Sequence, residues 1–474
     1  MRSGRLAAAT VGVVAVAALG ACQATPTPAD PYPANADGFG PRAGHRYRVS
    51  RWAEDWAAAR ATGTAPPLKA MPLGGGATLS VSAESRLRGN VYDHVMPRPG
   101  ERLDEGLFRG VLGADLRLDP RLRVYGEVAT GQVDGRAASA PANFQNDASL
   151  QQLFVDLRSR AGAVLLGAMV GRQEFADGPR QLVSLGDGPN LHRTWNGVRL
   201  YVHGASCRLG AFDLRATHLQ RGAFDEEVDH ADRLQGLAGG MVLAATTAST
   251  AYLDPFWYHS EDPDFRVGDD VGLDRRDTYG ARFWGRGGAW QWDSTLARQT
   301  GTHGERDVEA WAVFAAQSLA VANDGWRPRL TSHVDLASGG GSYEAGTVRN
   351  FHQLYASSSY LGEGRLLSLS NLLLVAPGLS VSPTPSSEFA LECGFARRLS
   401  SHDAAYAGGM RAYPGTQAVA GRGIGTLLRA AWSWSATDNV TVSVGCERLA
   451  AGDVLERAGL PSGSFLYASA TIRW

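Results

Sequence analysis

Apolar and polar residues alternate one by one over long stretches of this chain, starting at residue 77. In residues 77–88, one face of an extended strand would carry Ala77, Leu79, Val81, Ala83 and Leu87. The opposite face would carry Thr78, Ser80, Ser82, Glu84, Arg86 and Arg88. A period of two is typical of a β-strand whose faces meet different surroundings, and this strand is about as long as one that crosses a membrane.

The same alternation returns further along the chain. Residues 112–118 and 122–128 predict a hairpin with long arms around a tight turn at Asp119-Pro120, and residues 198–203 and 330–336 predict further strands. Longer polar, glycine-rich segments separate some of the strands: residues 131–148, 174–195, 221–235, 259–277 and 337–350. Short turns on one rim and long loops on the other are typical of outer-membrane barrels.

These patterns together predict an all-β fold, namely a transmembrane antiparallel β-barrel with short periplasmic turns and long extracellular loops. The predicted barrel, residues 71–474, holds 404 residues. At about 22 residues per strand and connection, that length gives roughly 18 strands. A barrel of this size is wide enough for an aqueous channel.

The last segment carries the most specific barrel pattern. Leu466, Ala468, Ala470, Ile472 and Trp474 alternate with Tyr467, Ser469, Thr471 and Arg473. Apolar residues at every second position before a final aromatic residue are similar to the closing strand of outer-membrane barrels. We therefore expect Trp474 to be the signal that the barrel-insertion machinery recognises.

The region before the barrel, residues 45–70, predicts a segment with one short helix. Residues 50–60 could form that helix with Ser50 as its N-cap, acidic Glu54 and Asp55 in the early turns and Arg60 near the end. Pro66 and Pro67 would stop it.

The first residues have the layout of a lipoprotein-type signal peptide, residues 1–21. Arg2 and Arg5 precede an apolar run over residues 6–19, which is shorter than the roughly 20 residues of a spanning helix. The sequence Leu-Gly-Ala-Cys at residues 19–22 resembles a lipobox, so we expect lipidation of Cys22, with residues 22–44 as a flexible tether. An ordinary signal peptide is the alternative. Both interpretations predict export, and the barrel places the protein in the cell outer membrane.

Composition and charge exclude further classes of protein. Loss of Arg2 and Arg5 leaves a formal net charge of 44 − 47 = −3, which argues against a general nucleic-acid binder. After the signal, no apolar run approaches the length of a membrane-spanning helix. Lys69 is the only lysine, and arginine supplies every other basic side chain. Cys207, Cys393 and Cys446 show no metal-ligand spacing; one pair could be bridged, or all could be packed thiols.

Several segments match a known family in order and spacing: residues 51–56, 67–73, 82–88, 151–157, 171–175, 184–193, 403–406 and 425–474. Across nearly all of residues 50–474, the chain resembles the alginate-export family of outer-membrane porins. The resemblance implies a monomeric barrel of about 18 strands with a pore lined by arginines and acidic residues. It places Arg172 in the family's Gly-Arg-Gln position, and Arg86 and Arg88 on the first-strand arginines. The residues at the expected pore positions are mixed in sign, and residues 51–56 are a mark of the broader family rather than of its alginate-exporting namesake.

No catalytic arrangement stands out in the sequence. The histidines are scattered, and there is no His-Glu-x-x-His or Gly-x-Ser-x-Gly motif and no phosphate-binding glycine-rich loop before a helix. We therefore predict a protein that is not an enzyme and has no cofactor and no metal site.

The predicted function is an outer-membrane channel for export or passage of an anionic solute, such as an acidic polysaccharide like alginate. The predicted pore-lining and substrate-binding residues are Arg86, Arg88, Arg109, Arg123, Arg172, Arg199, Arg282, Glu84 and Asp187. Glu84, Glu127 and Asp187 could also hold the arginines rigid through ion pairs. A small-solute diffusion porin and a non-conducting lipid-anchored barrel remain alternatives. The expected partners are outer-membrane lipid, the insertion machinery, periplasmic polymer-synthesis proteins and the anionic solute, without nucleic acid.

Overall fold

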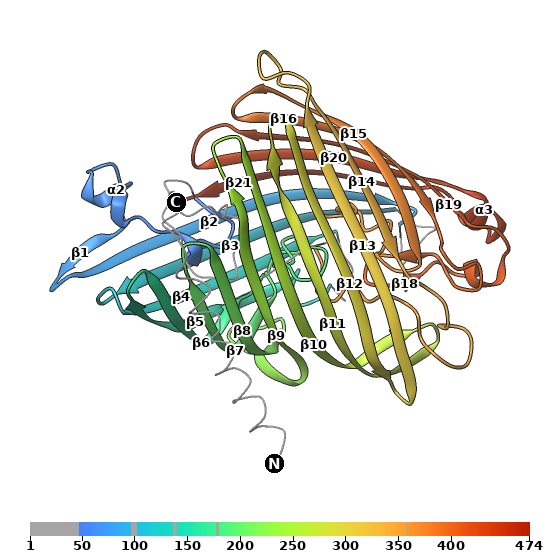
Figure 1. Ribbon diagram of the computed structural model, residues 1–474, viewed down its shortest axis with the longest axis horizontal. Helices are drawn as coiled ribbons and strands as arrows, with labels where there is room; N and C mark the ends of the chain where they lie inside the picture. The colour runs from blue at the N-terminus through green and yellow to red at the C-terminus, as the bar shows by residue number, and fades with distance from the viewer. Residues whose placement is uncertain (1–46, 96–101, 136–139, 177–179, 358) are drawn as a thin grey trace.

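The computed structural model describes residues 47–95, 102–135, 140–176, 180–357 and 359–474. Its strands form one large antiparallel sheet that closes into an 18-stranded barrel (Figure 1). The barrel strands are β2 (Ala77–Asp93), β3 (Arg102–Arg117), β4 (Leu122–Asp134), β5 (Asn146–Ala161), β6 (Val164–Glu174), β7 (Thr194–His203), β8 (Cys207–His218), β9 (Glu227–Ala245), β10 (Ser249–Val267), β11 (Asp270–Gly287), β12 (Trp290–His303), β13 (Arg306–Ala320), β14 (Arg329–Ala337), β15 (Leu372–Thr384), β16 (Ser387–Arg397), β19 (Gly423–Ser435), β20 (Val440–Ala451) and β21 (Gly463–Arg473).

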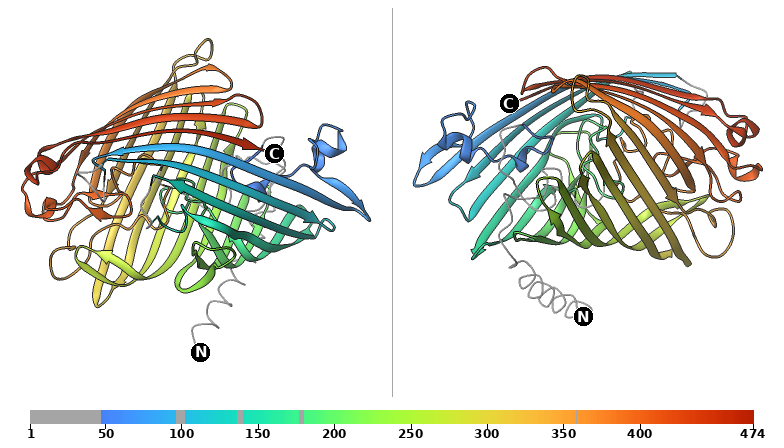
Figure 2. Two further views of the ribbon diagram at one scale, coloured as in Figure 1. Left: turned by 180° about the vertical axis from the view of Figure 1, so that it is seen from behind. Right: turned by 45° about the horizontal axis from the view of Figure 1, so that its top comes forward.

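The first and last barrel strands close the barrel. β2 pairs with β21 in a continuous register from Glu84 opposite Arg473 to Asp93 opposite Ser464. The two edges lie side by side in both views of Figure 2. Trp474 extends this seam, because its amide donates to the carbonyl of Ala83 and its main-chain oxygen accepts from the Ala83 amide. Closure leaves no unpaired barrel edge inside a membrane, as a spanning sheet requires.

The two faces of the wall differ as the alternation predicts. On β2, the inward Ser82, Glu84 and Arg86 are buried, whereas the outward Leu87 is 62% exposed. Leu112 on β3 and Leu391 on β16 are exposed to a similar extent. Lipid would cover these side chains, and the polar residues face the barrel interior, so the transmembrane barrel prediction is confirmed.

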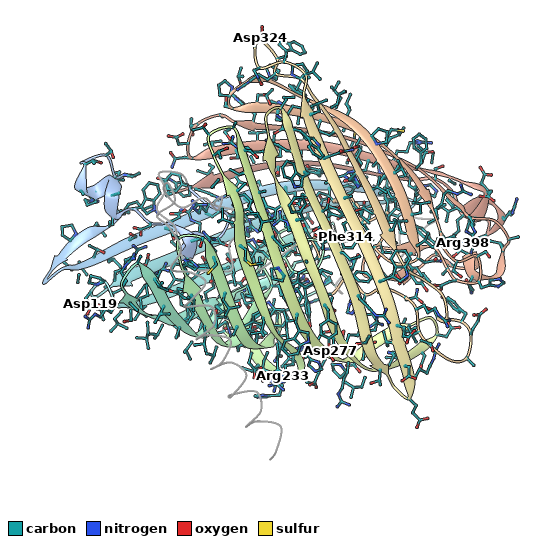
Figure 3. The ribbon with its side chains drawn as sticks, in the orientation of Figure 1. Asp119, Arg233, Asp277, Phe314, Asp324 and Arg398 are labelled. Carbon is teal, nitrogen blue, oxygen red and sulfur yellow. The ribbon has the colours of Figure 1, made fainter. Side chains whose placement is uncertain are left out.

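The rims differ in the length of their connections. Asp119 and Asp324, labelled in Figure 3, lie in short connections of one rim, and Arg398 begins a long connection on the other. The predicted turn at Asp119 is confirmed: its side chain accepts the amides of Arg121 and Leu122 at 2.6 and 2.9 Å.

Three loop predictions are wrong in their bounds. Residues 227–235 of the predicted loop 221–235 already belong to β9. Residues 259–277 are mostly strand, because β10 and β11 continue as a polar hairpin to a turn between Val267 and Asp270. The predicted loop 337–350 is part of a longer connection, residues 338–371. The long connection at residues 398–422, which holds the small strands β17 (Tyr406–Ala407) and β18 (Arg411–Ala412) and the 3₁₀ helix η3 (Thr416–Ala418), was not predicted. Polar composition does not separate an extended polar hairpin from a loop.

The segment before the barrel packs against the inner wall. The single helix predicted over residues 50–60 is wrong: a 3₁₀ helix η2 (Arg51–Ala53) and a short helix α2 (Ala57–Ala61) occupy this region. Ser50 does not cap a helix, because its hydroxyl donates to Glu174 on β6 at 2.7 Å. Trp52 is buried in a cluster with Tyr125, Phe154, Met169 and Tyr201 from β4 to β7. Tertiary contacts therefore override the local helix signal.

The single lysine anchors this segment to the seam. Lys69 is buried, forms an ion pair with Glu54 at 3.5 Å and donates to the main-chain oxygen of Trp474 at 3.0 Å. Arg51 donates to the same oxygen. β1 (Met71–Gly74) then turns back on the start of β2. The described N-terminal segment, residues 47–74, is thus packed against the barrel as part of the folded structure.

The remaining features of the chain are the N-terminal signal, the cysteines and the other helices. The signal peptide, Cys22 and the tether lie outside the described residues. Cys393 and Cys446 carry free thiols, so a bridge between them is not formed. Across the part of the chain that the structure describes, no helix is long and apolar enough to cross a membrane. A helix α3 (Asp453–Arg457) lies in the connection between β20 and β21.

Candidate functional site: the barrel interior

Two long connections fold into the barrel and meet there. The loop of residues 180–193, between β6 and β7, runs beside residues 353–357 of the connection between β14 and β15. Tyr355 joins them, because its carbonyl accepts the Ser184 amide at 2.9 Å and its amide donates to Leu182 at 2.8 Å. Leu182, Val183 and Leu354 contribute to the largest buried apolar cluster. These two inward loops therefore form a fixed partition inside the barrel.

A cluster of charges holds the first inward loop against β2 and β3. Arg109 is fully buried and binds Glu84 through Nε at 2.8 Å and Asp187 through Nη1 at 2.6 Å. Arg86 donates to the Asp187 carbonyl at 2.6 Å and also reaches the carbonyl of Pro189. The Asp187 side chain is 45% exposed. Its position inside the barrel would raise its pKa, but Arg109 and its other charged neighbours hold that pKa well below its usual range. The loop is therefore attached by charge-assisted bonds of the stronger kind.

His192 extends this cluster to β6. It lies on the inward loop, outside the strands, with Nδ1 beside Glu174 and Nε2 2.7 Å from Asp187. Burial alone would lower its pKa, but the two carboxylates outweigh that effect and raise the pKa to about 9. Protonated His192 thus bridges two carboxylates, one of which also accepts the Ser50 hydroxyl.

We predict that the attachment of the inward loop weakens at alkaline pH. Because the pKa is raised on folding, the contribution of His192 is fully present below its ordinary value of 6.5 and is lost as the pH rises through about 9. Single-channel recordings should become noisier across that window. A His192→Gln variant should be noisy already at neutral pH and show no such window. The exposed His402→Gln variant is the control, and equal pH profiles for His192→Gln and the unmodified protein would contradict the prediction.

The second group of arginines supports the N-terminal segment. Arg123 binds Asp115 at 2.6 Å and donates to the Trp52 carbonyl at 2.6 Å. Arg199 lies over the ring of Trp52, with 5.7 Å between the guanidinium carbon and the ring centroid. Both side chains are buried, so in this structure they act as supports of the inner wall.

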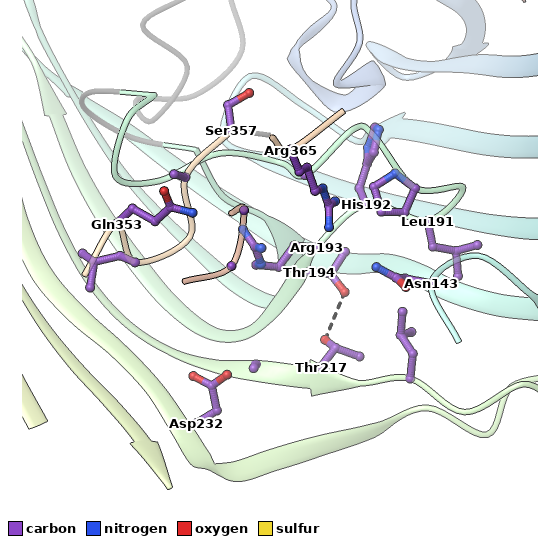
Figure 4. A pocket seen from close by; sticks show the side chains of 18 of the residues that line it. Asn143, Leu191, His192, Arg193, Thr194, Thr217, Asp232, Gln353, Ser357 and Arg365 are labelled. Carbon is purple, nitrogen blue, oxygen red and sulfur yellow. Dashed lines mark hydrogen bonds between the residues drawn. The ribbon is translucent and has the colours of Figure 1, made fainter. Parts of the chain in front are cut away.

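The inward loops also line a cavity of about 520 Å³ on the extracellular half of the interior. Arg193 and Arg365 extend into it from the two loops, and Asp229 and Asp232 line it from β9 (Figure 4). Thr194 and Thr217 face the same space and are joined by a hydrogen bond of 3.0 Å. The cavity thus combines cations from the loops with acids and hydroxyls from the barrel wall.

The two arginines of this cavity differ in how many contacts their guanidinium groups make. Arg193 donates to the carbonyls of Ser184 and Tyr355, and its guanidinium lies 5.0 Å from the centre of the Tyr355 ring. Arg365 is half-buried, and within the described residues its guanidinium has no ion pair or hydrogen bond. Burial, with Arg365 nearby, lowers the pKa of Arg193. Arg365 is therefore the cation that an incoming anion could bind, although Asp229 and Asp232 on the opposite wall offset part of the positive charge of the cavity.

The backbone at Arg365 is held in an uncommon conformation. Its φ of 55° lies in the left-handed region, which costs a non-glycine residue about 1–3 kcal/mol. Two backbone hydrogen bonds hold it: the Arg365 amide donates to Gly362, and its carbonyl accepts from Gly408. The surrounding structure therefore maintains this side chain in the cavity at an energetic cost.

Comparisons with known proteins agree with this architecture. Residues 77–468 match the family described as alginate export. The chain belongs to the alginate-export family. The resemblance found in the sequence is therefore confirmed, and family and fold together support an outer-membrane channel rather than an enzyme. No match was found among proteins of curated function.

Solved porins share the fold of this alginate-export barrel. OccK2 of Pseudomonas aeruginosa, in complex with glucuronate, aligns with a TM-score of 0.52 and 14% identity over 83% of this chain and 96% of OccK2. OccAB1 of Acinetobacter baumannii aligns with a TM-score of 0.54 and 12% identity over 84% of this chain and 96% of its own. At such identities the likeness shows the fold alone.

The predicted site residues fall into separate places in this alginate-export barrel. Arg86, Arg88, Arg109, Glu84 and Asp187 lie together inside it, where Arg88 binds Glu363 of the second inward loop at 3.2 Å. Two further arginines, Arg123 and Arg199, support the N-terminal segment, as described above. Arg282 lies across the interior and binds Asp293 through two nitrogens, at 2.7 and 2.5 Å.

Arg172 is the exception among the predicted pore arginines. It lies on the wall face opposite to Gln173 and Trp195, which are buried inside the barrel, and it pairs with Asn196 and Glu226 at 2.9 and 2.7 Å. The prediction that Arg172 points into the pore is therefore corrected. It rested on a motif match, whereas the alternation of β6 turns this side chain outward.

Two cavity residues were missing from the predicted site. Arg193 is the last residue of the segment 184–193 that matches the family. The sequence therefore marked this position but did not indicate its role in the cavity. Arg365 lies in a loop without periodicity, and only its position in the wall of the folded cavity reveals it. Among the described residues, no group of three or more His, Cys, Asp or Glu side chains could hold a metal ion.

Proposed function

We propose that this alginate-export barrel passes anionic, hydroxyl-rich solutes of the sugar-acid type, such as segments of an acidic polysaccharide, through its interior. The observation that carries the proposal is Arg365, whose guanidinium has no ion pair or hydrogen bond with the described residues and lies beside Arg193 in the extracellular cavity. A carboxylate would bind Arg365 through charge-assisted bonds.

The opposite wall of the cavity supports the second half of the proposal. Asp229, Asp232 and Thr217 could accept or exchange hydrogen bonds with sugar hydroxyls, which a simple inorganic anion does not have. The glucuronate in the OccK2 structure belongs to a barrel of the same fold and is consistent with this class of solute. Alginate itself is one candidate within the class.

The test is conductance of the refolded protein in planar bilayers, with uronate oligomers as blockers. We expect a current that uronates block, and Arg365→Ala should weaken the block by a factor of about five, since an exposed charge contributes about 1 kcal/mol or less. Arg365→Lys should keep part of the block. Arg298→Ala is the matched control, because Arg298 lies on the outward face of β12, opposite Trp311.

Each alternative has its own outcome in this experiment. A protein that inserts but carries no current would be a non-conducting surface barrel. A current that neither uronates nor Arg365→Ala affect would indicate a general diffusion porin. Equal block by a uronate and by a neutral sugar of the same size would also overturn the role of the cation.

A further inference from the structure

The interior contains a second compartment, on the periplasmic half. This cavity of about 750 Å³ is lined by the periplasmic ends of β10 to β14 and by Glu392 of β16. Tyr360, on the second inward loop, lines both this cavity and the extracellular one. The two compartments therefore lie in series along the barrel, on either side of one side chain.

Tyr360 is fixed in this dividing position from two sides. Its hydroxyl donates to Asp335 on β14 at 2.6 Å, and its carbonyl accepts from Arg429 on β19 at 3.2 Å. Its ring meets Phe314 of β13 edge-on, with 6.3 Å between ring centroids. Because the Tyr360 ring lines both cavities, a solute that moves from one to the other along this shared wall passes next to it.

Among the described charged side chains that line the periplasmic compartment, one arginine is open to a ligand. Its two carboxylates are engaged: Asp293 binds Arg282, and Glu392 binds Arg429 at 2.9 Å and His333 at 3.2 Å. Arg286, in contrast, is exposed, and the described part of the chain gives its side chain no ion pair or hydrogen bond. It is placed opposite Thr250 on one neighbouring strand and Gln291 on the other.

We propose that Arg286 forms a second anion subsite for a carboxylate-bearing sugar, separated from the Arg365 subsite by Tyr360. This deepens the proposed function and rests on it for the class of solute. The cation would bind the carboxylate, and Thr250 and Gln291 supply flanking hydrogen-bonding groups. Two weak subsites in series allow a charged solute to be held and then released to the next site.

The experiment is single-channel block by a monomeric uronate added to one side of the bilayer at a time, with channels inserted from one chamber. Arg286→Ala should shorten blocks from the periplasmic side about fivefold, because one exposed charge contributes about 1 kcal/mol or less. It should leave blocks from the extracellular side unchanged. Arg365→Ala should have the opposite sidedness, and Arg286→Lys should retain the periplasmic block.

Tyr360 supplies the second arm of the test. Tyr360→Ala should raise the open-channel conductance and make blocks from either side sensitive to both arginines. Tyr360→Phe should keep the division, since the ring remains. Arg298→Ala again controls for loss of a cation that does not face the interior.

The outcomes separate the two proposals. If Arg286→Ala leaves the periplasmic block unchanged while Arg365→Ala weakens the extracellular one, the second subsite is overturned and the proposed function stands. If only Arg286→Ala has an effect, the Arg365 site fails instead. If Tyr360→Ala changes neither conductance nor sidedness, Tyr360 does not divide the interior and the inference of two subsites in series is overturned.

Discussion

A Glu84→Ala variant is expected to lose most of its folded form, because it removes the acceptor of two arginines at the barrel seam. Glu84 lies on β2 with its side chain 3% exposed. It binds Arg109 on β3 at 2.5 Å through one oxygen and Arg473 on β21 at 2.7 Å through the other. Breaking a buried ion pair from one side costs about 3–5 kcal/mol. Arg109 keeps its bond to Asp187, so within the described residues the cation left without a carboxylate is Arg473. The loss falls on the contact between the first and last strands.

The measurement is the shift in gel mobility between unheated and heated protein, together with the urea midpoint of unfolding. Glu127→Ala is the matched control: Glu127 is a buried inward glutamate that accepts from Tyr125 and Gln152, and no arginine of the described residues binds it. It should lose much less, since no cation is stranded. Equal midpoints for the two variants would show that the Glu84 pairs contribute little to closure.

The strands of this barrel could be predicted from the sequence because each strand meets two solvents. Alternation at residues 77–88 and 466–474 directly encodes which side chains face lipid and which face the interior. The strand count followed from length alone. Such local signals need no knowledge of the partner strand, which explains why the fold class was correct while loop bounds were not.

The interior could not be predicted in the same way, because its contacts join distant parts of the chain. Arg86 was expected to face a channel and Asp187 to hold arginines through ion pairs, but which arginine would meet Asp187 was not predicted; in the structure Arg86 binds it, 101 residues away. That pairing depends on a loop turning inward, and no periodicity marks this. Arg365 and Arg286, which have no ion pair with the described residues, could be identified only after the paired arginines were known. Arginine content alone therefore indicates that the barrel interior is charged, but not which arginines are open to bind a solute.

Asp403 illustrates how one buried carboxylate organises the loops that the sequence did not resolve. It is completely buried at the start of the segment 403–406 that matched the family. One of its oxygens accepts from the Gly340 amide and from Asn350, each at 2.7 Å. The other accepts from the Ala404 amide at 2.8 Å and from the Tyr406 hydroxyl at 2.7 Å. Asp403 thus joins the segment of residues 398–422 to the inward loop that carries Tyr360 and Arg365.

Asp403→Ala is therefore expected to release this inward loop while leaving the barrel closed. The substitution strands several buried donors, and each unsatisfied group costs about 1–3 kcal/mol, which exceeds what a loop outside the strand ladder can absorb. Limited proteolysis should cut within residues 338–371 much faster, and the open channel should be larger and noisier. Gel mobility should still show a folded barrel, because no strand pairing involves Asp403. Asp453→Ala removes a carboxylate that is 42% exposed and whose ion pair among the described residues is with Arg457, so it should behave as the unmodified protein. If Asp403→Ala is no more sensitive to protease than Asp453→Ala, the inward loop is held by its own Leu361 and Leu366, which pack into the large apolar cluster, rather than by this carboxylate.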